Sequence, residues 1–252
     1  MAINIDIPSL EKKQATFRNV IKEDLGLRLP ACGGVFDKPL PVKEIYQIGG
    51  QYDSNVTLTR RMLLLLEGEW LFNPSGFDHV RRELLEQYLY DEPQEDKICL
   101  FLLNDIIRYW RTMCTDLEHK IRVQGKARAI RVIKLRFSRM LLYVSGVLTI
   151  GHGHGLCYED KIQSLSALFG KYPINRILSI AGEETTPILN LYAEFLEAMN
   201  TPSTRRALER EDRNSKVFQE MSNKAGQFRD NLHHLFLTHF ADDNPTRPRL
   251  LL

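Results

Sequence analysis

The sequence predicts an all-α fold, a helical bundle with a small irregular N-terminal element. Apolar residues recur mostly at helical spacing, and the sustained alternation of a strand is hard to find along the 252 residues. A hydrophobic fraction of 43% and a charged fraction of 26% are those of an ordinary globular protein with a sizeable core. The longest apolar run, residues 140–150, is too short to span a bilayer and is typical of a buried helix.

Helical periodicity predicts eight helices, taken here in chain order. They cover residues 10–25, 58–66, 76–90, 98–122, 127–148, 159–169, 186–199 and 214–240. Between the first two lies a stretch rich in proline and glycine, residues 26–55, which we expect to be an irregular connector with at most one short strand. The last residues, ADDNPTRPRLLL, contain two prolines and little to pack. The expected organisation is therefore an N-terminal helix and connector over 1–57, a helical domain over 58–240 and a loose tail over 241–252.

The helix over residues 98–122 is predicted to have two faces. At 100° per residue, one face of about 100° carries only apolar residues. They are Ile106, Trp110, Met113, Cys114, Leu117 and Ile121. The opposite side carries Asn104, Arg108, Arg111, Thr115 and His119. On the same helix, Asp105 with Arg108 and Asp116 with Lys120 have the spacing of intrahelical ion pairs, each contributing about 0.2–0.5 kcal/mol.

Positive charge is concentrated in one segment. From Lys120 to Arg139 there are eight basic residues and no acidic one, although the net charge of the chain is only +2. In the helix over 127–148, apolar residues lie nearly all round the cylinder from Val132 onward, which predicts burial on most sides. This helix nevertheless carries the cations Arg131, Lys134, Arg136 and Arg139. A buried cation needs a partner, which is here either a carboxylate of the preceding helix or a bound phosphate. Eight cations face three nearby carboxylates, so we expect a mixture of both.

Three segments carry a resemblance to a known family. LTRRMLLLLEGEWLFN, FLLNDIIRYWRTMCTDLEHK and AIRVIKLRFSRMLLYVSGVL resemble bacterial nucleotidyltransferase-like proteins, in which a DNA polymerase β-like domain precedes a helical substrate-binding domain. The likeness covers roughly residues 25–148. It implies that Arg108, Arg111, Asp116 and Lys120 on one helix and Lys134, Arg136 and Arg139 on the next belong to the family's signature, either binding substrate or pairing within the domain.

The catalytic motifs of that family are missing. Its chemistry uses a Gly-Ser turn for the triphosphate and an Asp-x-Asp pair for two metal ions, and the sequence contains neither. The resemblance therefore implies the helical back half of such a protein, without transferase activity of its own. Magnesium and a nucleoside triphosphate would be its cofactors only if a transferase region is encoded upstream. We expect it to bind a nucleotide, RNA or a partner subunit through the two basic helices.

A second, weaker likeness concerns the helix over 214–240. FRDNLHHLF contains Arg229 and, five positions later, His234, the spacing found in HEPN ribonucleases. In that chemistry the histidine acts as general acid or base on the ribose 2′-hydroxyl and the arginine stabilises the phosphate, with two copies of the motif brought together in a homodimer. The alternative is that the histidines lie at the edge of a buried stripe. A purely structural or inhibitory subunit of a larger complex is the third hypothesis.

The sequence gives little support for a metal site or for a secretory signal. GHGHGLC offers His152, His154 and Cys157 as ligands, but no fourth ligand is evident and a glycine-rich turn explains the pattern equally well. The four cysteines contain no CxxC pair, and the N-terminus lacks a secretory signal. We therefore expect a cytoplasmic protein with no bound metal and no membrane association.

Overall fold

The chain forms an all-α fold, as the sequence predicts. The structure is a computed structural model that describes residues 7–26, 40–51, 53–70, 73–90, 94–210 and 215–250, and within these ranges it contains no strand. The chain divides into two compact units, residues 1–63 and 64–252. This division falls inside a helix, Asn55–Glu67, six residues after the boundary that the sequence analysis places behind residue 57.

The first unit contains short helices and one buried ion pair. Its elements are α1 (Ile7–Asn19) with a π-helical turn at Val20–Asp24, α2 (Val42–Ile45), and most of α3 (Asn55–Glu67). The buried Arg61 on α3 pairs with Asp53 Oδ1 at 2.9 Å and donates to the carbonyl of Gln47 at 3.0 Å. These contacts hold the chain before α3 against the helix. The irregular connector predicted over 26–55 thus includes a helix, while residues 27–39 lie outside the described ranges.

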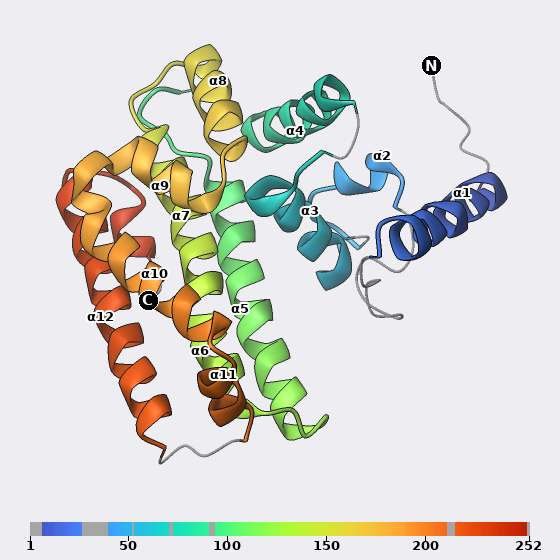
Figure 1. The fold of residues 1–252 in the computed structure, drawn as a ribbon. Helices are drawn as coiled ribbons and strands as arrows, with labels where there is room; N and C mark the ends of the chain where they lie inside the picture. Colours follow the sequence, from blue (N-terminus) through green and yellow to red (C-terminus); the bar gives the residue numbers. More distant parts are fainter. Residues whose placement is uncertain are drawn as a thin grey trace. The chain divides into compact units, whose positions relative to one another are not determined.

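The second unit is a helical bundle (Figure 1). Its helices are α4 (Pro74–Leu89), α5 (Leu100–Arg122), α6 (Arg128–Lys134), α7 (Met140–His152), α8 (Tyr158–Phe169), α9 (Pro173–Ala181), α10 (Thr186–Asn200), α11 (Pro202–Glu209) and α12 (Lys216–His239). The long helices agree with the prediction, but α9 and α11 were not predicted. Both are short, with nine residues in α9 and eight in α11, so the helical repeat of apolar residues is too brief to be recognised in the sequence. None of the helices in the described ranges is long and apolar enough to cross a membrane.

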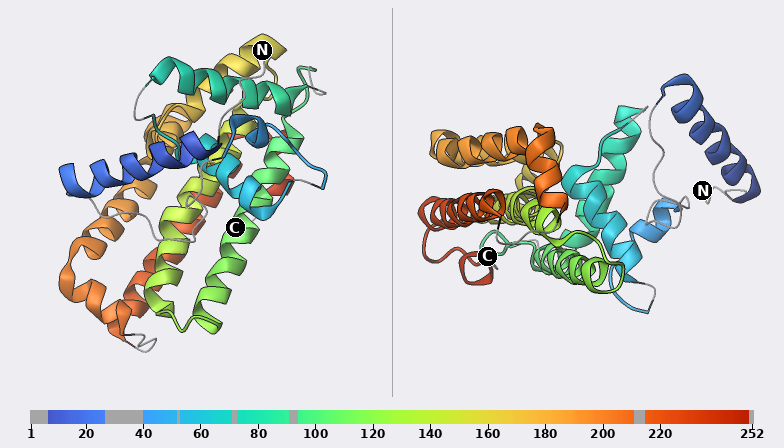
Figure 2. Two further views of the ribbon diagram at one scale, coloured as in Figure 1. Left: turned by 90° about the vertical axis from the view of Figure 1, so that its right-hand side faces the viewer. Right: turned by 60° about the horizontal axis from the view of Figure 1, so that its bottom comes forward.

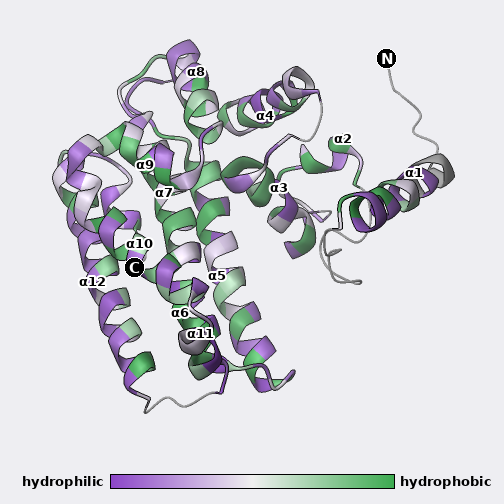
Figure 3. Ribbon diagram, in the orientation of Figure 1, coloured by the Kyte–Doolittle hydropathy of each residue, from purple (hydrophilic) through white to green (hydrophobic). Residues whose placement is uncertain are grey.

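Helix α7 is the centre of the bundle. Every residue from Met140 to Gly151 is buried, and the helix packs against α5, α8, α9 and α12. Its hydrophobic character is visible around most of the cylinder in Figure 3. A Cβ atom at Gly146 would lie 2.7 Å from a methyl group of Leu66, so glycine permits the close approach of the neighbouring side chain. The sequence prediction of a helix buried all round is confirmed for this part of the 127–148 segment.

A π-helical segment, Leu135–Arg139, joins α6 to α7 and makes Arg128–His152 an almost continuous helical run. Its Phe137 is fully buried. The ring stacks on Phe195 of α10 at 4.6 Å between centroids and lies against Phe228 of α12 at 5.0 Å. Helices α10 and α12 themselves lie side by side (Figure 2). This aromatic cluster therefore fixes the π-helical segment against both C-terminal helices.

Arg176 on α9 is fully buried without an acidic partner in the described ranges. Its five N–H groups face four neutral acceptors at 3.0–3.1 Å: the carbonyls of Leu168, Leu66 and Lys171 and the hydroxyl of Ser145. Leu66 and Leu168 are the penultimate residues of α3 and α8, where carbonyls lack intrahelical partners and carry the negative end of the helix dipole. Burial, followed by the charge of Arg81, lowers the pKa of Arg176 to about 9, so the guanidinium stays charged at neutral pH.

Part of the C-terminal segment is packed rather than loose. Asn244 and Thr246 are buried, and Asn244 Nδ2 donates to the carbonyl of Gly151 at the end of α7 at 3.1 Å. Asn244 Oδ1 in turn accepts from the amide of Thr246 at 3.0 Å. At Gly151 a Cβ atom would lie 2.6 Å from the Phe240 ring, so only glycine accommodates the returning chain. Within the loose tail predicted over 241–252, Asn244 and Thr246 are therefore packed, whereas residues 241–243 and 248–249 are exposed. Asn244 hydrogen-bonds the end of α7, and Thr246 hydrogen-bonds Asn244.

Replacing Arg176 with alanine should strongly destabilise the bundle. The substitution removes a buried donor from three carbonyls and one hydroxyl, and each group that is left without another partner costs about 1–3 kcal/mol. We expect the free energy of unfolding in urea to fall by at least about 3 kcal/mol. Arg82→Ala, which removes an exposed arginine of α4, should change it by no more than about 0.5 kcal/mol. Similar stabilities for the two variants would contradict this account of Arg176.

Stability should also depend on the protonation of His152. Burial and the neighbouring imidazole of His239 lower the pKa of His152 below its ordinary value of 6.5. The unfolded chain therefore binds this proton more tightly, and the stabilisation is lost as the pH falls from about 6.5 through the folded-state pKa. We expect the melting temperature to drop between pH 7.5 and pH 5.5, and to drop less in His152→Asn. An equal decrease in both proteins would refute the role of this histidine.

Candidate anion-binding site

One of the predicted anion-binding arginines, Arg108, pairs with the buried carboxylate of Asp105. Asp105 Oδ1 lies 2.6 Å from Arg108 Nη1, and Oδ2 accepts a hydrogen bond of 2.6 Å from the hydroxyl of Tyr88. The Asp105 side chain is only 4% exposed, and a buried carboxylate costs several kcal/mol if it lacks partners. Arg108 therefore stabilises an internal charge, and its guanidinium is engaged within the fold.

Four further ion pairs involve other basic residues of the segment from Lys120 to Arg139. They are Lys120–Asp116 at 2.5 Å, Arg122–Glu118 and Arg128–Glu118 at 3.1 Å, and Arg139–Glu67 at 3.2 Å. All join partly exposed side chains, and pairs of this kind contribute about 0–1 kcal/mol each. Among the predicted anion-binding residues, Lys120 and Arg139 thus have carboxylate partners, which a phosphate would have to displace.

Four cations of the predicted set have no acidic partner within the described ranges. They are Arg111, Arg131, Lys134 and Arg136. Lys134, Arg136 and Arg139 are exposed, which corrects the expectation that the basic residues lie on a helix buried on most sides. The all-round burial begins at Met140, one residue after the last arginine. Before that residue the helical run has one buried face, which includes Ile133 and Phe137, and solvent reaches the other face.

Three cations come together where α6 packs against α11: Arg131, Lys134 and Arg205, here called the basic cluster. Burial, the charge of Arg205 and the charge of Arg131 lower the pKa of Lys134, while Glu209 acts in the opposite direction. Glu209 also pairs with Arg205 at 3.1 Å. The basic cluster thus holds three positive charges against one nearby carboxylate, and the repulsion between these like charges is unfavourable without a bound anion.

Arg131 adds an unsatisfied donor to the basic cluster. Its Nε atom is buried and has no hydrogen-bond partner in the structure. Arg131 and Lys134 are three residues apart on α6, so their side chains leave the same face of the helix. A tetrahedral phosphate or a planar carboxylate is the ligand type that such a group of guanidinium and ammonium donors binds best.

Arg205 is the residue that the sequence analysis missed. It lies on α11, a short helix with one buried residue, and it is separated from Arg131 by more than seventy positions in the chain. The only local signal is the spacing of Arg205 and Glu209, which is that of an exposed ion pair in any helix. Its position beside Lys134 depends on the packing of α11 on α6, which no local pattern predicts.

The two residues of the predicted ribonuclease motif are exposed on α12. Arg229 hydrogen-bonds the adjacent Asp230 through Nε at 2.9 Å and Nη2 at 2.7 Å, and His234 lies one and a half turns further along the helix. Because α12 is continuous from Lys216 to His239, a separation of five residues places the two side chains about 140° apart around the axis. Within one chain they therefore point into different sectors.

The glycine-rich segment between α7 and α8 forms a turn. Within the described part of the chain, no group of three or more histidine, cysteine, aspartate or glutamate side chains is arranged to hold a metal ion. Cys157 Sγ contacts Asp160 Oδ2 at 3.1 Å, and Gly155 adopts a positive φ of 81°. His152, His154 and Cys157 are thus not assembled as a ligand set, and the turn is the better explanation of GHGHG.

Comparison with models of protein families, with curated proteins and with solved structures finds no match to this chain. The basic cluster is therefore argued from its own geometry and charge.

Proposed function

We propose that the protein binds a phosphate-bearing ligand, a nucleotide or RNA, through the basic cluster at α6 and α11. The observation that carries the proposal is the imbalance of three neighbouring cations, of which only Arg131 is partly buried, against one carboxylate. A bound phosphate would supply the missing negative charge and an acceptor beside the unpaired Nε of Arg131. Arg111 and Arg136, which also lack acidic partners in the described ranges, are further candidates for contacts along an extended ligand.

Binding rather than nucleotidyl transfer is the proposed activity of this chain. The sequence resemblance to nucleotidyltransferase-like proteins supports a phosphate-bearing ligand, because the helical domain of that family is its substrate-binding part. The chain contains no Gly-Ser dipeptide and no Asp-x-Asp pair, so the residues that would hold a triphosphate and two metal ions are not provided. Transfer would require a partner or further segment that supplies them.

Charge reversal in the basic cluster tests the proposal. We expect Lys134→Glu to weaken the binding of a fluorescein-labelled single-stranded RNA by about tenfold or more at low salt, measured by fluorescence anisotropy. Because one phosphate contact is lost, the slope of log K against log salt should become shallower by about 1. Lys134 is exposed, so the variant should melt close to the wild-type temperature.

Lys171→Glu is the matched control. It makes the same change of charge on an exposed lysine in the α8–α9 connection, where the ammonium group contacts only Ser179, at 2.7 Å. Its affinity for RNA should stay within about twofold of the wild type. Equal losses in the two variants would show that net charge, not the basic cluster, controls binding. Binding that does not weaken with salt would instead favour a protein partner and the structural-subunit hypothesis.

The ribonuclease hypothesis for Arg229 and His234 stays a prediction. The exposure of both side chains is compatible with a site shared between two copies of α12, and their divergence around the helix axis gives no support to a site within one chain. We therefore place phosphate binding at the basic cluster before ribonuclease activity.

A further inference from the structure

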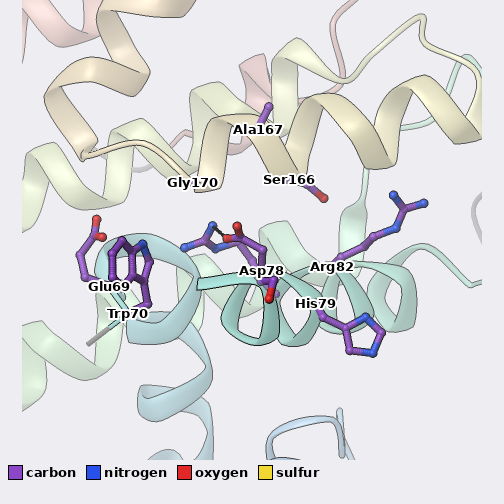
Figure 4. A pocket seen from close by; sticks show the side chains of 10 residues that line it. Glu69, Trp70, Asp78, His79, Arg82, Ser166, Ala167 and Gly170 are labelled. Atoms are coloured by element: carbon purple, nitrogen blue, oxygen red, sulfur yellow. Dashed lines mark hydrogen bonds and ion pairs between the residues drawn. The ribbon is translucent and has the colours of Figure 1, made fainter. Parts of the chain in front are cut away.

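A second site is indicated by a pocket of about 560 Å³ between α4 and α8, in which the chain after α3 forms one wall. Figure 4 shows Ser166 reaching from α8 toward α4, with Glu69 and Trp70 at the side. The volume falls within the range of about 300–1,000 Å³ typical of small-molecule sites. All its lining residues belong to the second unit, and none belongs to the basic cluster.

Of the charged residues that line this pocket, Glu69, Asp78, Arg81 and Arg82, only Arg81 is buried. Its side chain is 7% exposed, and its guanidinium lies over the ring of Phe77 at 4.8 Å. Nη1 pairs with Asp78 at 3.0 Å, Nη2 makes a long contact of 3.4 Å to the carbonyl of Gly68, and the buried Nε has no partner. Burial lowers the pKa of Arg81 despite the opposing charges of Asp78 and Glu69. The Arg81 guanidinium thus makes fewer good hydrogen bonds than a buried arginine needs.

A second buried cation lies near the first. Arg176 has only neutral acceptors, and the charge of Arg81 is a cause of its lowered pKa. The paired carboxylate of Asp78 is itself 65% exposed, so it offsets little of this charge inside the protein. Two desolvated guanidinium groups therefore lie near each other. Two exposed carboxylates, Asp78 and Glu69, act on Arg81, but only Asp78 forms an ion pair with it. A negative group placed in the pocket would be attracted to both.

Other residues that line the pocket indicate what kind of molecule carries this negative group. Trp70 is 50% exposed and offers an indole face at the pocket edge, which is suited to a flat ring. Ser166 Oγ is buried without a hydrogen-bond partner, although its helix could have carried alanine there at no cost. At Gly170, a Cβ atom would lie 3.2 Å from Arg81 Nη1, so glycine keeps the space above the guanidinium open.

We propose that the α4–α8 pocket binds a small ligand in which a planar ring carries a phosphate or carboxylate group. The anionic group lies toward Arg81 and Ser166, and the ring lies on Trp70. The pocket shares no residue with the basic cluster, so the two sites can be occupied independently.

Trp70 supplies the reporter that tests the pocket. The chain has two tryptophans, and the other, Trp110, stacks on Tyr143 at 5.2 Å. Trp110→Phe keeps a ring against Tyr143 and leaves Trp70 as the only tryptophan. In the full-length protein with this change, AMP and benzoate should each alter the Trp70 fluorescence saturably, and inorganic phosphate should compete. The stronger of the two ligands identifies phosphate or carboxylate as the preferred group. Adenosine, which has the ring without the anion, should bind at least about tenfold more weakly than AMP.

Ser166→Ala separates a ligand-binding hydroxyl from a structural one. Removing a buried hydroxyl without a partner should raise the melting temperature of the unliganded protein, and should weaken binding of the preferred ligand by about three- to tenfold. Ser222→Ala is the matched control, because Ser222 Oγ on α12 is also buried without a partner but lies outside the pocket. It should raise the melting temperature without changing the affinity.

Lys134→Glu should leave the Trp70 response unchanged, because it alters the basic cluster alone. The proposal for the pocket is overturned if neither AMP nor benzoate changes the Trp70 fluorescence saturably. It is overturned equally if adenosine binds as tightly as AMP, or if Ser166→Ala and Ser222→Ala retain the same affinity.

Discussion

The bundle depends on buried cations that are held by backbone carbonyl groups. Arg176 joins the ends of α3 and α8 to α7 through four neutral acceptors, and the buried Lys161 donates to the carbonyls of Gln94 and Lys97 at 2.9 and 2.5 Å. Carbonyls at helix ends need donors, and Arg176 satisfies those at the ends of α3 and α8, whereas Lys161 satisfies two carbonyls between α4 and α5. The four acceptors of Arg176 are neutral, so none of these contacts balances its positive charge with a carboxylate. The fold therefore keeps an excess of positive charge around Arg176.

An excess of positive charge is also common to the two sites proposed. On α5 the acidic side chains are committed to the fold: Asp105 is buried between Tyr88 and Arg108, and Asp116 pairs with Lys120. Few carboxylates remain for the cations of α6 and α11 or for Arg81 beneath the α4–α8 pocket. Repulsion between like charges and burial raise the free energy of such charges, and an anion from solution lowers it again. In both proposals, a bound anion would supply the negative charge that the neighbouring cations lack.

The long helices could be predicted from sequence because their apolar stripes are local. The short α9 and α11, the packed C-terminal segment and the division inside α3 could not, since each depends on contacts between distant residues such as Asn244 and Gly151. For the site, counting charges predicted a mixture of carboxylate pairs and phosphate contacts, and the pairs of Lys120 and Arg139 are present among the described residues. A charge count could not identify Arg205 as the neighbour of Lys134, and the apolar pattern after Val132 placed Lys134 and Arg136 in the interior although both are exposed. The α4–α8 pocket carries no sequence motif.

Hydrogen–deuterium exchange with and without a single-stranded RNA tests the central claim most directly, because it locates the bound ligand on the chain. If unbalanced charge at the basic cluster binds phosphates, amide exchange should slow in α6 and α11 and stay unchanged in α4 and α8. The effect should disappear as salt displaces the RNA. Protection centred instead on α12 around Arg229 and His234, or the absence of any protected segment at a salt concentration where RNA is bound, would contradict the account.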